Sequence, residues 1–192
     1  TLQTSALTLK RLKDNASAAF ERYDYGTTMA LLREAFLNSG LHANSTEEMQ
    51  DWLSVTRALD CWDRFQHVQA WNLLLGFRER MNDQFRFLKA VIWSRTCADA
   101  SFTCDGLEGI GNTAKGHGYE LVDDLLLNAE RRAARGLYDD AVARLYRATE
   151  LLAQIRLQRE YHIDTGNIDT ANSSLMPADV DWLTHGMSPN KK

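Results

Sequence analysis

Residues 120–163, ELVDDLLLNAERRAARGLYDDAVARLYRATELLAQIRLQREYHI, carry the clearest helical pattern in this sequence. Apolar side chains recur three to five residues apart before position 134 and three to four residues apart after position 140, which places each set on one helical face. The first face is formed by Leu121, Leu125, Ala129 and Ala133, and the second by Ala141, Leu145, Ala148, Leu152 and Ile155. The pattern predicts two amphipathic helices in this stretch.

A short polar segment separates these two helices. Gly136 can adopt the left-handed conformation that commonly follows a helix, and Asp139 or Asp140 can cap the first amides of the next one. Two helices joined by so short a turn pack antiparallel. We therefore expect a helical hairpin against which the rest of the chain is built.

The same periodicity predicts further helices over residues 5–23, 29–38, 46–65, 67–80 and 81–96. Thr27 or Thr28 would cap the second of these helices, and a Ser45/Glu48 capping box would start the third. Only two prolines interrupt the 192 residues, and β-branched runs that would favour strands are missing. The expected fold class is all-α, a bundle of stacked antiparallel helical hairpins.

The expected domain organisation is a single globular domain. Its parts are helical hairpins over 1–96, a long Gly-rich loop over 97–118, a long helical hairpin over 119–168, and a tail over 169–192. Pro177 can start a short helix within the tail. The first residue is Thr1 rather than Met, so we expect an excerpt of a longer chain.

An aromatic residue followed five positions later by alanine occurs at three predicted turns. The pairs are Tyr25 with Ala30, Phe65 with Ala70, and Tyr138 with Ala143. The turn around Gly136 is similar to that of a tetratricopeptide hairpin, which would make the chain a protein-interaction or dimerisation module. The aromatic residues are 40 and 73 residues apart, so stacked hairpins fit better than a regular solenoid.

Composition excludes several classes of protein. A net charge of −4 does not fit a general polyanion binder, although 16 Arg against 6 Lys leaves room for a local basic groove. No apolar run is long enough to cross a membrane. Cys61, Cys97 and Cys104 are an odd number without a CxxC pair, which favours free thiols, a reducing cytoplasmic location and no zinc site, although Cys97 and Cys104 could form a disulfide. No cofactor is expected, because the glycines near position 110 do not follow a strand.

One candidate catalytic pair lies at the end of the long hairpin. Arg156 and His162 are separated by five residues, which matches the R-X4–6-H pattern of HEPN ribonucleases. There the Arg would polarise a phosphate and the His would move a proton during attack by an RNA 2′-hydroxyl. The alternative interpretation is a solvated Arg and a histidine at a helix end.

Two other clusters combine acidic and basic groups. Asp60, Asp63, Arg64 and His67 share one helical face, so Asp63 could pair with His67 for catalysis, or Asp60 could simply pair with Arg64. The second cluster contains Glu120, Asp123 and Asp124. These carboxylates stabilise a helix start and could in principle bind a metal.

Three separated blocks together resemble one known family. They are TLKRLKDNASAAFERYDYGTTMALL, LDCWDRFQHVQAW, and NAERRAARGLYDDAVARLYRATELLAQIRL followed by HIDTGNI. These blocks resemble the helical C-terminal part of CRISPR-associated proteins that carry an N-terminal CARF sensor domain. The resemblance implies type III antiviral defence, with this chain as the helical effector or scaffold domain that relays or supports a cyclic-oligoadenylate sensor missing from this sequence.

The same resemblance suggests an activity and partners. Related effectors with HEPN domains are dimeric, metal-independent endoribonucleases, which would imply a homodimer acting on single-stranded RNA. Arg156 and His162 are the residues that match the family's catalytic spacing, whereas Leu157 stands where the family has Asn. The alternatives left open are a ribonuclease, a scaffold without chemistry, and a tetratricopeptide-like interaction module.

Overall fold

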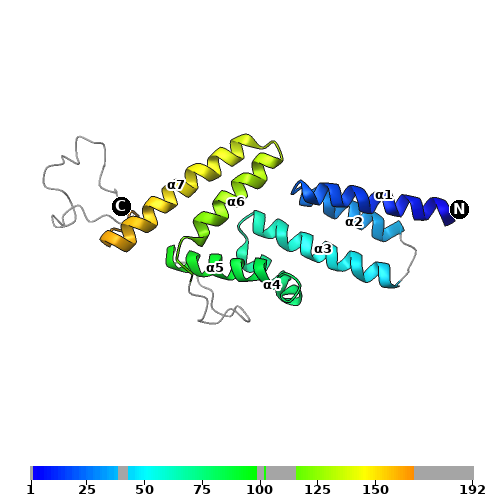
Figure 1. The fold of residues 1–192 in the computed structure, drawn as a ribbon, viewed down its shortest axis with the longest axis horizontal. Coiled ribbons are helices and arrows are strands. Elements are labelled where there is room, and N and C mark those ends of the chain that lie inside the picture. The colour runs from blue at the N-terminus through cyan, green and yellow to red at the C-terminus, as the bar shows by residue number, and fades with distance from the viewer. Residues whose placement is uncertain (1, 39–42, 99–101, 103–115, 167–192) are drawn as a thin grey trace. The chain divides into compact units, whose positions relative to one another are not determined.

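The computed structural model describes residues 2–38, 43–98, 102 and 116–166, and Figure 1 shows that their elements are helices. The all-α prediction is confirmed, since no strand occurs among these residues. The helices are α1 (Leu2–Glu21), α2 (Tyr25–Asn38), α3 (Ala43–Asp63), α4 (His67–Leu74), the 3₁₀ turn η1 (Leu75–Phe77), α5 (Asn82–Ala98), α6 (Glu120–Ala134) and α7 (Tyr138–Tyr161).

The chain forms two compact units, Thr1–Ala148 and Thr149–Lys192. Their boundary falls within α7, so the first unit contains α1 to α6 and the first half of α7. The domain division expected from the sequence stays a prediction, and most of its Gly-rich loop, its tail and Cys104 lie outside the described residues.

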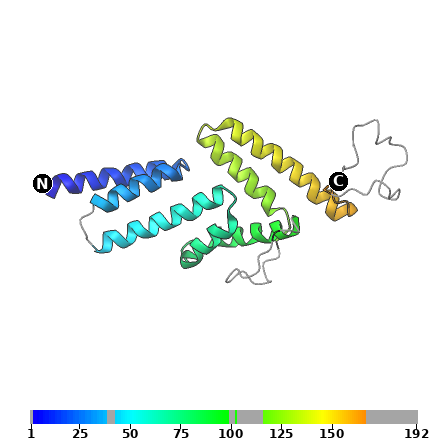
Figure 2. The same cartoon turned by 180° about the vertical axis from the view of Figure 1, so that it is seen from behind.

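Successive helices of the first unit pack against one another. α2 contacts both α1 and α3, α4 contacts both α3 and α5, and α6 contacts α5. Figure 2 shows from behind that α1 and α2, and likewise α6 and residues 138–148, lie side by side. The stacked antiparallel hairpins predicted from the sequence are therefore present in this unit.

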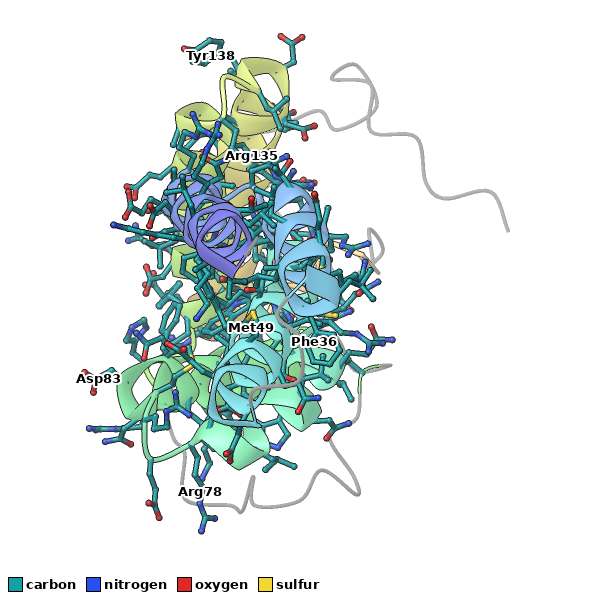
Figure 3. The ribbon with its side chains drawn as sticks, turned by 90° about the vertical axis from the view of Figure 1, so that its right-hand side faces the viewer. Phe36, Met49, Arg78, Asp83, Arg135 and Tyr138 are labelled. Carbon is teal, nitrogen blue, oxygen red and sulfur yellow. The ribbon has the colours of Figure 1, made fainter. Side chains whose placement is uncertain are left out.

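Two apolar clusters hold these helices together. The larger joins α3, α4 and α5 around Trp71, Leu88 and Ile92, none of which is exposed. The smaller joins α1, α2 and α3 around Ala35 and Met49. Burial of such side chains contributes about 1.5–3 kcal/mol each relative to exposure. In Figure 3 Met49 lies among the helices, whereas Arg78 and Tyr138 point away from them.

Three hairpin turns share the same backbone geometry. Tyr23, Phe65 and Gly136 each follow a helix with φ of 60°, 58° and 75°. In each turn the next residue donates its amide hydrogen to a carbonyl five residues back, at 2.9 Å in all three cases. The amides of the three residues themselves bond to carbonyls three residues back at 2.8–2.9 Å. This is the Schellman arrangement, which satisfies carbonyls at a helix end.

The common turn puts small residues at matching places in each hairpin. Alanines stand seven residues before the left-handed residue, and small side chains stand five residues after it. All six are nearly or fully buried: Ala16, Ala58 and Ala129 before the turn, and Thr28, Ala70 and Ala141 after it. Small side chains on both helices let the two backbones of a hairpin approach closely.

This geometry corrects the register of the repeat inferred from the sequence. The sequence pattern treats Phe65 as the equivalent of Tyr25 and Tyr138. In the structure Phe65 occupies the left-handed position, and His67 is the residue equivalent to Tyr25 and Tyr138. All three predicted hairpin turns are present, and the middle one is shifted by two positions from the predicted register.

The first turn of α2 differs from the prediction. The helix begins at Tyr25 rather than near Met29, because Asp24 is its cap. The Asp24 carboxylate accepts hydrogen bonds from the Thr27 amide at 3.2 Å and the Thr27 hydroxyl at 2.8 Å. Aspartate at this position satisfies amides that would otherwise be unpaired. Likewise α3 begins at Ala43, before the predicted capping box.

The predicted apolar face of α7 is partly wrong. Ala141, Ala148 and Ile155 are buried as expected, but Leu145 and Leu152 are 47% and 46% exposed, and Leu151 is buried instead at 5%. Because residues 151 and 152 are both apolar, the helical spacing fits a face that contains Leu151 as well as a face that contains Leu152. The prediction included Leu145 and Leu152, which the structure leaves at the surface, in place of Leu151.

Candidate functional site

Arg156 and His162 lie at the carboxyl end of α7, in the second unit. The Arg156 side chain is 67% exposed, and its Nε donates a hydrogen bond to Glu160 Oε2 at 3.1 Å. His162 directly follows the last helical residue, is exposed, and has a φ of 55°. The structure thus places both predicted catalytic residues at one helix end and at the surface.

The backbone around His162 adopts an uncommon conformation. Few non-glycine residues have positive φ, although histidine is enriched among them. The conformation ends the helix, and the Ile163 amide then donates to the Leu157 carbonyl at 3.2 Å. An exposed guanidinium and an exposed imidazole six positions apart can bind a phosphate and move a proton, which are the two tasks of the predicted chemistry.

The second predicted cluster, around His67, is a buried structural network rather than an open site. The His67 and Asp124 side chains are 0% and 1% exposed, and His67 Nε2 lies 3.0 Å from Asp124 Oδ2. The Trp62 indole donates to the other carboxylate oxygen of Asp124 at 2.9 Å. Arg95 Nη1 lies 3.4 Å from His67 Nδ1. With the hydrogen on Nε2, the imidazole donates to Asp124 through Nε2 and accepts from Arg95 at Nδ1, so both ring nitrogens have a partner.

Asp63 is held by three residues of α6. Its carboxylate accepts hydrogen bonds from Asn128 Nδ2 and Arg131 Nε, each at 2.9 Å, and pairs with Arg132 Nη2 at 2.8 Å. The Asp63 side chain is 5% exposed. A buried carboxylate is tolerated in this way when it is fully hydrogen-bonded and paired with cations.

These contacts overturn the predicted Asp63–His67 pair. The histidine bonds to Asp124 and the aspartate bonds to α6, so each group is engaged in joining the end of α3 and the start of α4 to α6. The simpler alternative, an ion pair between Asp60 and Arg64, is confirmed. Because the network is buried, its groups are not available to a macromolecular substrate.

The carboxylates at the start of α6 also do not converge on a metal. Glu120 accepts hydrogen bonds from the amides of His117 and Gly118 at 2.5 and 2.9 Å, while Asp124 is buried in the network. Asp123 is about half exposed and lies 3.6 Å from His117 Nε2. Within the described part of the chain, no three potential ligands form a group able to hold a metal ion.

Sequence reasoning missed the buried polar side of α6. Asp124, Asn128 and Arg132 are spaced four residues apart and form a stripe beside the apolar face. The apolar periodicity alone does not identify that side of the helix as buried. The sequence does contain a signal for this buried side, namely the regular spacing of a carboxylate, an amide and a guanidinium along one stripe of the helix. Such a stripe can form hydrogen bonds with the polar end of another helix.

The helices of the described residues do not include one long and apolar enough to cross a membrane.

Comparison with known proteins places Arg156 and His162 within a matched region. No curated protein and no solved structure matches the chain. Residues 111–187, about two fifths of the sequence, match the family model described as "Csm6 HEPN domain". The matched region contains α6, α7, Arg156 and His162. This match indicates a CRISPR-associated protein family, in agreement with the resemblance found in the sequence.

Proposed function

We propose that the chain is the helical effector part of a CRISPR-associated defence protein and cleaves single-stranded RNA without a metal ion. Arg156 and His162 would be its catalytic residues. The observation that carries this proposal is their location: the HEPN family match covers the end of α7, where both side chains are exposed at the R-X4–6-H spacing.

The proposed reaction is an internal transfer within the RNA. His162 takes the proton of a 2′-hydroxyl, and the oxygen attacks the adjacent phosphorus. The bond from phosphorus to the 5′-oxygen of the next nucleotide breaks, leaving a 2′,3′-cyclic phosphate and, after that oxygen gains a proton, a 5′-hydroxyl. Arg156 would stabilise the extra negative charge on the phosphate oxygens in the transition state.

A second copy of the chain would complete this site. One exposed imidazole can accept the proton from the 2′-hydroxyl but a second group must protonate the leaving oxygen. Two α7 ends brought together would supply one imidazole to accept the first proton and a second to protonate the leaving oxygen. Their contact would also exclude water from Arg156 and His162, which are open to solvent in one copy. The proposal therefore includes a homodimer with RNA bound between the two α7 ends.

The experiment is cleavage of a fluorescent single-stranded RNA in the presence of EDTA. Loss of cleavage in His162→Ala and Arg156→Ala would support the assignment, with an expected decrease of about 10²–10⁴-fold for loss of a general acid or base. His117→Ala is the matched control, because His117 is also exposed and lies within the matched region but has no Arg six residues before it. Equal loss in the control would contradict the proposal.

A scaffold without chemistry of its own is the second candidate function. It is favoured by the ion pair that Arg156 already makes with Glu160, and by Leu157 at the family's Asn position. In this role the hairpins would support or relay a cyclic-oligoadenylate sensor, or bind a partner protein as tetratricopeptide hairpins do. The absence of RNA cleavage by the chain, both with and without added cyclic oligoadenylate, would favour this second function.

A further inference from the structure

A cavity of about 320 Å³ lies within the first unit, away from the residues assigned to RNA cleavage. It is bordered by α2, α3, α5 and α6. Its apolar walls come from Leu59, Trp62, Phe87 and Leu127. This volume is at the lower end of the range for small-molecule sites, which are usually mostly apolar with a few fixed polar groups.

Two stacked rings form one wall of the cavity. The Trp62 and Phe87 centroids are 6.0 Å apart and the ring planes meet at 30°. The Trp62 ring cannot turn freely, because its indole nitrogen donates to the buried Asp124 carboxylate at 2.9 Å. A fixed aromatic wall favours a flat aromatic occupant, since stacking needs no rearrangement of the protein.

The Tyr25 side chain supplies a hydrogen-bond donor to this cavity. Tyr25 is only 6% exposed, yet its hydroxyl makes no hydrogen bond to another described residue. The proton of this hydroxyl is therefore available for donation to water or to a ligand in the cavity. Burial raises the pKa of Tyr25 to about 12, so the hydroxyl keeps its proton at neutral pH.

Arg131 supplies a second donor beside Tyr25. Its Nε bonds to Asp63 at 2.9 Å and its Nη2 lies 4.0 Å from Asp124, so the guanidinium is held in place and still has N–H groups left to donate. The charge of Arg131 is balanced by these carboxylates. The site therefore suits a neutral acceptor oxygen better than a free anion.

We propose that this cavity binds a nucleobase that carries an exocyclic carbonyl oxygen, as uracil and guanine do. The ring would stack on Trp62 and Phe87, and the oxygen would accept hydrogen bonds from Tyr25 and Arg131. Adenine has no exocyclic oxygen, so it binds more weakly. The proposal does not depend on the ribonuclease activity, because none of these residues is part of the Arg156–His162 pair.

The test is isothermal titration of the whole chain with uridine and with guanosine, compared with adenosine. Uridine and guanosine should each bind at least fivefold more tightly than adenosine, because about fivefold in affinity corresponds to roughly one hydrogen bond. That result supports the proposal. No binding at millimolar concentration, or equal binding of adenosine, overturns it.

Two variants locate the binding. Tyr25→Phe removes only the hydroxyl and is expected to weaken uridine binding about fivefold. Leu127→Ala should also weaken it, whereas Leu126→Ala is the matched control, because Leu126 and Leu127 are both 40% exposed and only Leu127 borders the cavity. Uridine binding that is equal in all three variants and in the unmodified chain would place the ligand elsewhere and refute the assignment.

Discussion

Replacing Gly136 by alanine tests the shared turn geometry directly. Gly136 has a φ of 75°, and a Cβ added there would meet no atom within 4 Å, so any effect comes from the backbone alone. The left-handed conformation costs an L-residue about 1–2 kcal/mol, while alanine restricts the unfolded chain by about 0.4–1 kcal/mol. The substitution should therefore lower the free energy of unfolding by about 1 kcal/mol.

Gly76 is the matched control for this substitution. It lies in the 3₁₀ turn η1 without a positive φ, and a Cβ added there also has open space. Gly76→Ala should raise the free energy of unfolding by about 0.4–1 kcal/mol, because only the unfolded chain loses freedom. The sign of the effect is thus expected to be opposite at the two glycines.

The same reasoning extends to Tyr23 and Phe65. Replacing either residue by glycine or by alanine removes nearly the same side chain, so the difference between the two variants isolates the backbone. The glycine variant should be more stable than the alanine variant, by about 1 kcal/mol, at both positions. Urea unfolding followed by far-ultraviolet circular dichroism measures each value. Alanine equal to or better than glycine at these positions and at 136 would refute the Schellman assignment.

Three further predictions concern packing and charge. Asp124→Ala should cost about 3 kcal/mol or more because it leaves two buried donors unpaired, whereas Asp123→Ala, at a half-exposed site, should change stability by under about 0.5 kcal/mol in urea unfolding. Ala129→Leu should cost about 1–3 kcal/mol by forcing two helices apart, while Ala143→Leu at an exposed position should cost little, as thermal unfolding would show. Stability should also fall from pH 10 towards pH 12 by about 2–3 kcal/mol through Tyr25, because burial raises its pKa to about 12 and the unfolded chain releases the proton first. Tyr25→Phe should remove this contribution to the loss of stability between pH 10 and pH 12. The same dependence of unfolding free energy on pH in the variant and in the unmodified chain would contradict the assignment to Tyr25.

Much of the fold follows from local signals in the sequence. Gly136 and the apolar residues on both sides of it predict the last hairpin, because helical periodicity and a left-handed glycine are both local properties. Tyr23 and Phe65 adopt the same backbone without the glycine signal, so two of the three equivalent turns could not be recognised by residue type. The start of α2 at Tyr25 likewise depends on the Asp24 cap, whereas the sequence pattern placed the cap at Thr27 or Thr28.

The polar side of α6 shows where local reasoning ends. Asp63 and Asn128 are far apart in the sequence, and nothing in either neighbourhood reveals that they meet. Asp63 and His67 are close in sequence and share a predicted face, yet tertiary contacts give each a different partner. Arg156 and His162 lie at one exposed helix end, and the joint action proposed for them involves a second copy of the chain, which is not a local property of the sequence.

Analysis of the RNA ends tests the central proposal most directly. After incubation of the chain with single-stranded RNA and EDTA, mass spectrometry would identify the product termini. The proposed attack by the 2′-hydroxyl predicts 2′,3′-cyclic phosphate and 5′-hydroxyl ends that are lost in His162→Ala and retained in His117→Ala. Products with 3′-hydroxyl and 5′-phosphate ends, or no products at all, would contradict it.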